Sequence, residues 1–201
     1  MPTLLADERR ARVQIGFQRR FDTGYATARA AVAAGSLGWI HTLRGGTADP
    51  APPPAAYIAT SGGIFANCSV HDFDAIRWVT GREIVDAYAT GSNRGANTFG
   101  QAGDALAMVS ATRYNGAGYD VRLEVLGSAG SVGIGLDDGL PLTSAEPDVA
   151  WPAGPSYTGF VERFHDAYVR ELEAFLDVVT GGIQSPHHRR RPGSAVCGAG
   201  V

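Results

Sequence analysis

The stretch SGGIFANCSVHDFD, residues 61–74, carries the side chains of this sequence best suited to acid–base chemistry. Asn67, His71 and Asp74 are spaced four and three residues apart, so on a helix they would share one face. Histidine has a proton affinity that suits a general base, and a carboxylate one turn away could orient its ring. The same spacing fits a structural role, in which His71 bridges elements and Asp72 and Asp74 complement the positive helix end. Spacing alone leaves both interpretations open.

Hydrophobic patterning predicts the elements that precede this stretch. The apolar run 13–17 reads as a strand, and Asp22 can cap a following helix that Gly35 ends. Residues 39–47 have strand character. The proline-rich residues 48–57 then predict a loop, because proline lacks the amide hydrogen that helices and strands use.

The remaining chain predicts a sheet and a closing helix. We expect a helix from Ile64 to Val79 that Gly81 stops, followed by a strand at 83–92 and a glycine-rich loop at 93–104. Two or three strands should follow between 105 and 136, and an amphipathic helix should end at Gly181. The glycine-rich residues 126–135 lack the strand and helix context of a phosphate loop and predict a turn between strands. This order of elements indicates an α+β fold with a mostly antiparallel sheet.

Composition excludes several classes of function. The 201 residues carry 17 basic and 20 acidic side chains, so no basic surface for nucleic acid or membranes is expected. All the basic residues are arginine, which rules out lysine chemistry. No apolar run is long enough to span a bilayer, and no signal peptide fits the charged N-terminus. Cys68 and Cys197 are far apart without metal or redox spacing, which favours a cytoplasmic protein with no metal site.

Four segments together resemble the C-terminal half of the Gfo/Idh/MocA oxidoreductases, above all the inositol 2-dehydrogenases. They are VQIGFQRRFDTGY, DPAPPPAAYIATSGGIFANCSVHDFDAIRWVTG, DAYATGSNRG and SATRYNGAGYDVRLEVLGSAG. The resemblance covers about residues 11–184. It implies an open, mostly antiparallel sheet with helices packed on one face, and enzymes that use NAD or NADP to oxidise a polyol or sugar.

The resemblance also assigns roles to residues. It makes His71 the catalytic acid/base that takes the proton of the substrate hydroxyl, with Asn67 beside it in the catalytic pair. Asp74 is expected to hold substrate hydroxyls or orient the site. Asp49, in the proline-rich loop, and Tyr119 are weaker candidates for substrate contact.

The sequence departs from this family in three ways. Asn67 stands where most such enzymes place an aspartate, and an amide cannot serve as a proton acceptor. The N-terminal Rossmann domain and the lysine that the family uses beside the substrate are absent from this sequence, so we expect the chain alone to bind no NAD(P) and to be inactive or nearly so. We therefore predict a substrate-binding and oligomerisation domain at 1–184, followed by a disordered or frameshifted tail at 185–201.

Two other functions stay open. The chain could be a non-catalytic module that forms homo-oligomers through its sheet face, for which Val121, Leu123 and Val125 would supply apolar material. It could also be the remnant of a decaying gene.

Overall fold

The structure, a computed structural model, describes residues 14–92 and 95–181. The chain divides into two compact units, one formed by 17–168 and the other by 1–16 together with 169–201. The first unit holds every element up to α4 and the first turn of α5. The predicted tail at 185–201 lies outside the described residues.

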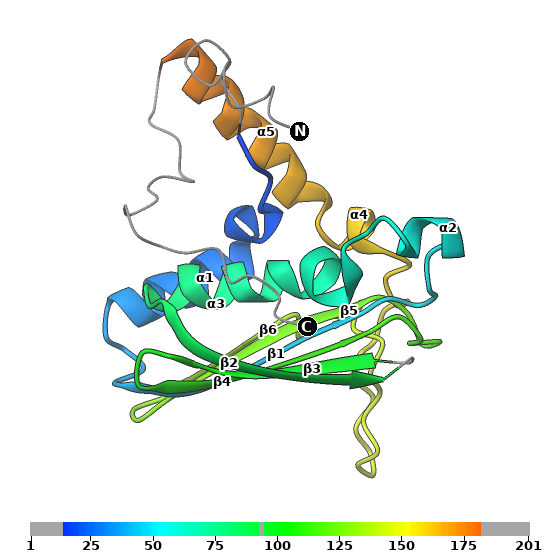
Figure 1. The fold of residues 1–201 in the computed structure, drawn as a ribbon. Coiled ribbons are helices and arrows are strands. Elements are labelled where there is room, and N and C mark those ends of the chain that lie inside the picture. Colours follow the sequence, from blue (N-terminus) through cyan, green and yellow to red (C-terminus); the bar gives the residue numbers. More distant parts are fainter. Residues whose placement is uncertain (1–13, 93–94, 182–201) are drawn as a thin grey trace. The chain divides into compact units, whose positions relative to one another are not determined.

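The elements follow one another along the chain in the order of their labels in Figure 1. They are the 3₁₀ turn η1 (Gln18–Phe21), α1 (Thr23–Ala33), β1 (Ile40–Ala48), α2 (Ala55–Ile58), the π-helical turn η2 (Phe65–Ser69), α3 (Val70–Thr80), β2 (Ile84–Ser92), β3 (Gly95–Ala102), β4 (Ala105–Thr112), β5 (Asp120–Gly127), β6 (Ser131–Ile134), α4 (Phe160–Arg163) and α5 (His165–Thr180).

The six strands form one open sheet in the order β2-β3-β4-β1-β5-β6. β1 pairs in parallel with β4, and every other pair of neighbours is antiparallel. Helices α1 and α3 lie side by side on one face of this sheet (Figure 1). The predicted α+β class, with a mostly antiparallel open sheet and helices on one face, is confirmed.

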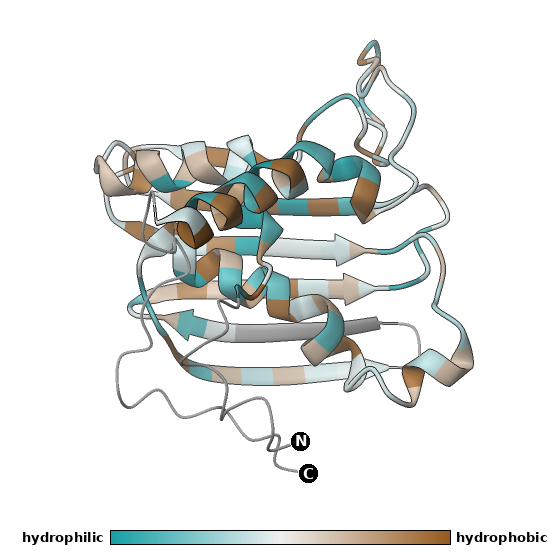
Figure 2. Ribbon diagram, turned by 90° about the horizontal axis from the view of Figure 1, so that it is seen from above, coloured by the Kyte–Doolittle hydropathy of each residue, from teal (hydrophilic) through white to brown (hydrophobic). Residues whose placement is uncertain are grey.

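The core lies between that helical layer and the sheet. Ala105, Ala107, Val109 and Ala111 of β4 are buried while the residues between them are more exposed, and β5 alternates in the same way. Such alternation is what a sheet covered on one face requires, and hydrophobic and hydrophilic residues are interleaved along the elements in Figure 2.

One expectation about the sheet face is wrong. Val121, Leu123 and Val125 are at most 3% exposed and belong to the core, so they cannot form an open oligomer surface. The uncovered face carries the other residues of each strand. Strand register places Tyr88, Met108, Arg44 and Glu124 in one row there, next to Leu106.

Local signals explain the helix ends that were predicted correctly. The carboxylate of Asp22 accepts hydrogen bonds from the amides of Gly24 and Tyr25 at the start of α1, as an N-cap does. Gly81 ends α3 in the left-handed region at φ 68°, a conformation that glycine adopts without steric cost.

Several predicted elements differ from the structure. Residues 14–17 form no strand and lead instead into η1. The glycine-rich segment predicted as a loop contains β3, because hydrogen bonds to β2 on one side and β4 on the other hold the backbone extended. The C-terminal helix is interrupted at Phe164, between α4 and α5.

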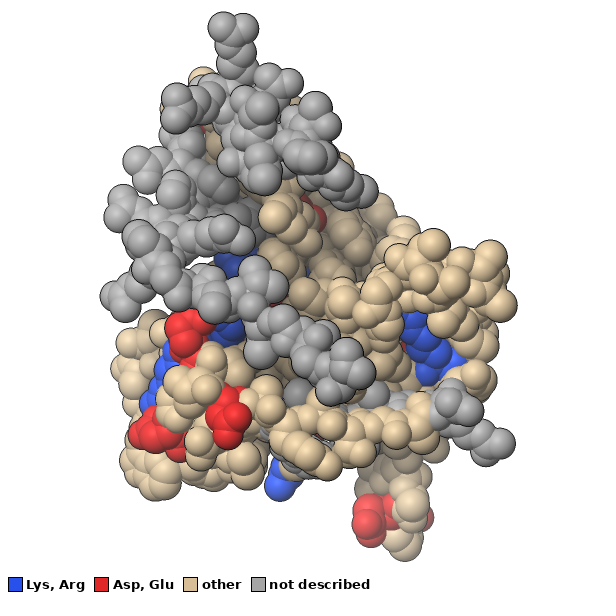
Figure 3. Space-filling model, viewed as in Figure 1, with Lys and Arg blue, Asp and Glu red and all other residues tan. Residues whose placement is uncertain are grey.

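Two further features are the distribution of charged side chains and the hydrophobicity of the helices. On the face shown in Figure 3, the visible charged residues form small groups of both signs rather than one basic surface. Within the described part of the chain, no helix is both long and apolar enough to cross a membrane.

Candidate active site

A cavity of about 710 Å³ lies in the unit formed by residues 17–168. Its wall combines proline and aromatic side chains with polar ones. The polar and aromatic lining residues are Gln18, Arg19, Thr47, Asp49, Tyr57, Asn67, Cys68, His71, Arg113, Tyr119, Thr158, Phe160 and Tyr168. Four of the five predicted site residues are therefore brought together: His71, Asn67, Asp49 and Tyr119.

His71 reaches the cavity from the first turn of α3. Its Nδ1 atom is buried without a hydrogen-bond partner, so Nδ1 is not exposed to a ligand in the cavity. The Phe17 ring stands edge-on to the imidazole at 6.1 Å between centroids. Burial, and then the positive charge of Arg19, lower the pKa of His71 below its ordinary value of 6.5, against the opposite effect of Asp72 and Asp74. The lowered pKa favours the neutral imidazole at neutral pH, which is the form that accepts a proton.

Asn67 lies on the π-helical turn that precedes α3, and both ends of its amide are engaged. Its Oδ1 accepts a hydrogen bond from Nη2 of Arg113, and its Nδ2 donates to the hydroxyl of Tyr57 at 2.6 Å. Nε of Arg113 also lies 3.6 Å from a carboxylate oxygen of Asp49. These four side chains form a continuous polar wall that we call the Asn67 network.

The parallel pair of strands explains why Asp49 and Arg113 meet. Each is the first residue after its strand, β1 or β4, and parallel neighbours end at the same edge of the sheet. The amide of Asp49 donates to the carbonyl of Thr112, and its carbonyl accepts from the amide of Asn115. Burial raises the pKa of Asp49, and the Arg113 charge opposes that rise.

Arg19, in the cavity wall, belongs to a buried ion pair that the sequence did not suggest. Nη1 of Arg19 is 2.6 Å from Oδ1 of Asp72, and the two side chains are only 3% and 2% exposed. The Thr47 hydroxyl accepts from Nη2 of Arg19 at 2.8 Å and donates to Asp72 at 2.9 Å. Asp72 therefore does more than complement the start of α3: it joins that helix to η1 and β1.

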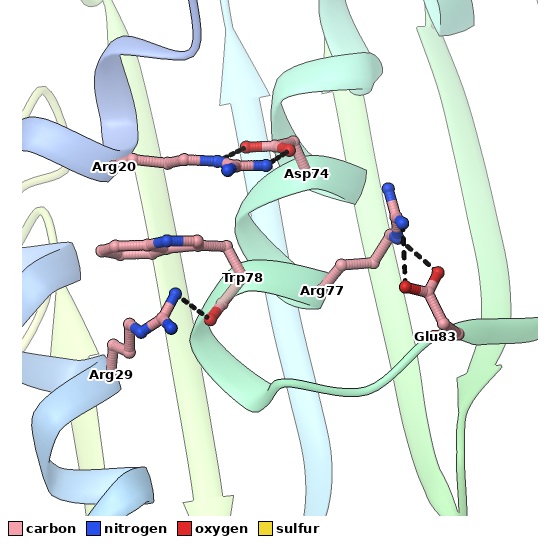
Figure 4. Close-up of polar contacts among 6 residues, drawn as sticks. All are labelled: Arg20, Arg29, Asp74, Arg77, Trp78 and Glu83. Atoms are coloured by element: carbon pink, nitrogen blue, oxygen red, sulfur yellow. Dashed lines mark hydrogen bonds and ion pairs between the residues drawn. The ribbon is translucent and has the colours of Figure 1, made fainter. Parts of the chain in front are cut away.

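Asp74 does not line the cavity. Both of its oxygens accept hydrogen bonds from Arg20, at 2.9 and 2.5 Å (Figure 4). Further along α3, Arg77 donates two hydrogen bonds to the carboxylate of Glu83. The backbone carbonyl of Trp78 accepts a hydrogen bond from Arg29 of α1. Asp74 is thus part of the packing of α3 and is left out of the proposed site.

Tyr119, the residue directly before β5, lines the cavity. It is 5% exposed, and burial raises the pKa of its hydroxyl, with the Arg19 charge opposing the rise. Its amide donates to the carbonyl of Tyr157 at 2.7 Å. Tyr119 is therefore a neutral phenol at physiological pH.

Sequence reasoning missed Tyr57 and Arg113, which complete the polar wall. Tyr57 lies on the single-turn helix α2, inside a stretch predicted as loop, and Arg113 lies 46 residues from its partner Asn67. The usable signal was the position of Arg113 directly after a strand, where parallel neighbours would bring it beside Asp49. Among the described residues, no group of three His, Cys, Asp or Glu side chains could hold a metal ion.

Comparison with known proteins agrees with this fold. Residues 25–133, more than half of the chain, match the model of the GFO/IDH/MocA C-terminal domain. The chain belongs to the Gfo/Idh/MocA family. It is 37% identical to a myo-inositol dehydrogenase of Streptomyces leeuwenhoekii over 195 residues, 90% of this chain and 58% of that protein. It is 38% identical to the myo-inositol 2-dehydrogenase of Thermotoga maritima over 181 residues, 83% of this chain and 54% of that protein.

Solved structures of this family have the same fold. A putative myo-inositol dehydrogenase from Sinorhizobium meliloti matches with a TM-score of 0.79 and 29% identity, over 92% of this chain and 60% of that one. The scyllo-inositol dehydrogenase of Lactobacillus casei, solved with NAD(H) and scyllo-inositol, matches with a TM-score of 0.73 and 30% identity, over 89% and 57%. The Gfo/Idh/MocA chain described here spans about half the length of the relatives it matches.

Proposed function

We propose that this chain is the polyol-binding domain of an NAD(P)-dependent inositol 2-dehydrogenase-like oxidoreductase, with His71 as its acid/base residue. The observation that carries the proposal is the presence of a neutral imidazole and the Asn67 network in one cavity. The charges of that wall are paired, Arg19 with Asp72 and Arg113 with Asp49, so the cavity suits an uncharged ligand rich in hydroxyl groups. Inositols are ligands of this kind.

His71 would move the substrate proton. In the tautomer with hydrogen on Nδ1, the lone pair of Nε2 accepts the proton of a substrate hydroxyl when the alcohol is oxidised and returns it when the ketone is reduced. Asn67 and Asp49 would bind or orient neighbouring hydroxyls, and Tyr119 would be a further contact. The lowered pKa keeps His71 able to accept a proton at neutral pH.

No NAD(P) site is assigned to the described residues. A dinucleotide is usually held by a strand that leads through a glycine-rich loop into a helix, and the glycines at 126–135 join two antiparallel strands instead. A bound dinucleotide would supply the hydride acceptor, while the residues described here would bind the polyol and move its proton. We predict that a fluorescence titration of this chain with NADH shows no saturable binding, and saturation at micromolar NADH would overturn that prediction.

Calorimetric titration with myo-inositol and scyllo-inositol tests the proposed function. We expect saturable binding, weakened at least about fivefold by His71→Ala because a ligand hydrogen bond is lost. The exposed His165 offers a matched control, and His165→Ala should bind as the unaltered chain does. If neither inositol binds, or if both histidine variants bind equally well, the polyol-site proposal is refuted.

A second candidate is a non-catalytic oligomerisation module. It is supported by the uncovered sheet face, where Leu106 and Tyr88 are 51% and 68% exposed. Light scattering should then show a homo-oligomer that Leu106→Glu dissociates. A monomer at all concentrations would leave this candidate without support.

We also propose that the chain acts in the cytoplasm. Cys68 is a buried free thiol, and burial raises its pKa to about 12, so it is unreactive and needs no oxidising compartment.

A further inference from the structure

In the Asn67 network, one hydrogen bond determines the direction of the next. An amide that accepts from Arg113 through Oδ1 cannot flip, because the flipped form would point its NH₂ group at the guanidinium. Nδ2 must then face Tyr57, where it donates to the phenol oxygen at 2.6 Å. The direction of both hydrogen bonds is therefore set by Arg113.

This direction has a consequence for Tyr57. Since its oxygen is the acceptor in the bond from Asn67, the phenol hydrogen is not used there, and Tyr57 lines the cavity with 44% of its surface exposed. A phenol that accepts one hydrogen bond is also a better donor, because chains of hydrogen bonds polarise one another. The free hydrogen can be donated to an oxygen of a bound ligand.

Local structure holds this donor in place. The prolines that lead into α2 fix the entry of the chain, and the amides of Tyr57 and Ile58 donate back to the Pro54 carbonyl. The Tyr57 carbonyl in turn accepts from the amide and hydroxyl of Thr60. Hydrogen bonds therefore hold the backbone of Tyr57 on both sides, and Asn67 orients the phenol oxygen.

We propose that Tyr57 is a substrate-binding residue that donates a hydrogen bond to a hydroxyl oxygen of the polyol, and that Arg113 is a positioning residue acting through Asn67. This inference rests on the proposed polyol function and adds two specificity-determining residues to it. His71 engages the hydroxyl that loses its proton, whereas Tyr57 holds a different hydroxyl of the same ring.

The first test measures inositol binding by calorimetry with the full 201-residue chain. Tyr57→Phe keeps the ring and removes only the hydroxyl, and it should weaken binding of myo-inositol by about 5- to 10-fold. Tyr114 is exposed and does not line the cavity, so Tyr114→Phe is the matched control and should leave the affinity unchanged. A series of monodeoxy-inositols should contain one compound whose affinity is the same for the Tyr57→Phe variant and the unaltered chain.

The second test separates positioning from general structure. Arg113→Met should weaken binding and shift the side-chain NH₂ resonances of Asn67, and Arg113→Lys should restore part of the affinity because an ammonium can still donate to Oδ1. In an Asn67→Ala background, Arg113→Met should weaken binding less than it does alone, since Asn67 is gone and only the contact of Arg113 with Asp49 is left to lose.

The outcomes distinguish the two levels of the proposal. If the unaltered chain binds no inositol, the proposed function fails and takes this inference with it. If the unaltered chain binds and His71→Ala weakens binding but Tyr57→Phe does not, only the role of Tyr57 is refuted. If Arg113→Met is as harmful in the Asn67→Ala background as alone, its positioning role is refuted.

Discussion

The buried pair of Arg19 and Asp72 gives the sharpest test of how this site is supported. Arg19→Met keeps most of the apolar volume and removes the guanidinium. Asp72 is then left 2% exposed, with the Thr47 hydroxyl as its remaining hydrogen-bond donor among the contacts described above. A buried carboxylate without its counter-charge is far more costly than the intact pair.

The expected magnitude follows from that burial. Removing one partner of a buried pair costs about 3–5 kcal/mol, a large share of the 5–15 kcal/mol that is typical of the total stability of a domain. The exposed pair of Arg44 and Glu124 lies 3.3 Å apart with 56% and 45% of its side chains exposed, so Arg44→Met should cost about 0–1 kcal/mol. The contrast between the two arginines is the prediction.

Urea denaturation followed by tryptophan fluorescence and circular dichroism measures both costs. The double variant Arg19→Met with Asp72→Asn should recover much of the lost stability, because no charge stays buried. A cost below about 1 kcal/mol for Arg19→Met, or a double variant no more stable than the single one, would show that the pair does not support α3 as described.

Three further predictions concern the backbone and the acid/base residue. Gly135→Ala should destabilise the chain by more than about 2 kcal/mol in urea denaturation, because φ is +79° and an added Cβ would lie 2.2 Å from the Val121 carbonyl oxygen, whereas Gly116→Ala, with open space around it, should have little effect. Asn67→Asp places a negative charge one turn from His71 and should raise the pKa of that imidazole in an NMR titration; an unchanged or lower pKa would contradict their proximity. The pKa of His71 is lowered in the folded chain, so the contribution of His71 to stability should be complete above pH 6.5 and be lost as pH falls below that value. His71→Gln should flatten this part of the curve of stability against pH. An equal slope in both proteins would contradict the burial of the ring.

Short-range signals account for what could be predicted from the sequence. Asp22 and Gly81 mark helix ends through interactions with their own neighbours, so their roles are visible in the sequence. The alternation along 121–125 correctly indicated a sheet with one covered face. It could not say which face, because both the helical layer and an open oligomer surface can be apolar. The assignment of Val121, Leu123 and Val125 to the open face was wrong for that reason.

The parts that could not be predicted depend on contacts between distant segments. β3 has little apolar material, and its state is decided by backbone pairing with β2 and β4. Asp74 shares a predicted helix face with His71, yet its carboxylate accepts a hydrogen bond from Arg20, 54 residues away in the sequence. The link between Arg113 and Asn67 likewise depends on strand order, which local patterns do not specify.

The central claim is that His71 faces a polyol in this cavity, and its imidazole resonances report on that most directly. Chain labelled with ¹³C-histidine would be titrated with scyllo-inositol, with His71→Gln used to assign the signal. We predict that the His71 resonance shifts and saturates with the same dissociation constant that calorimetry gives, while the exposed His165 stays unchanged. An unperturbed His71 signal when inositol binding is saturated would contradict the account.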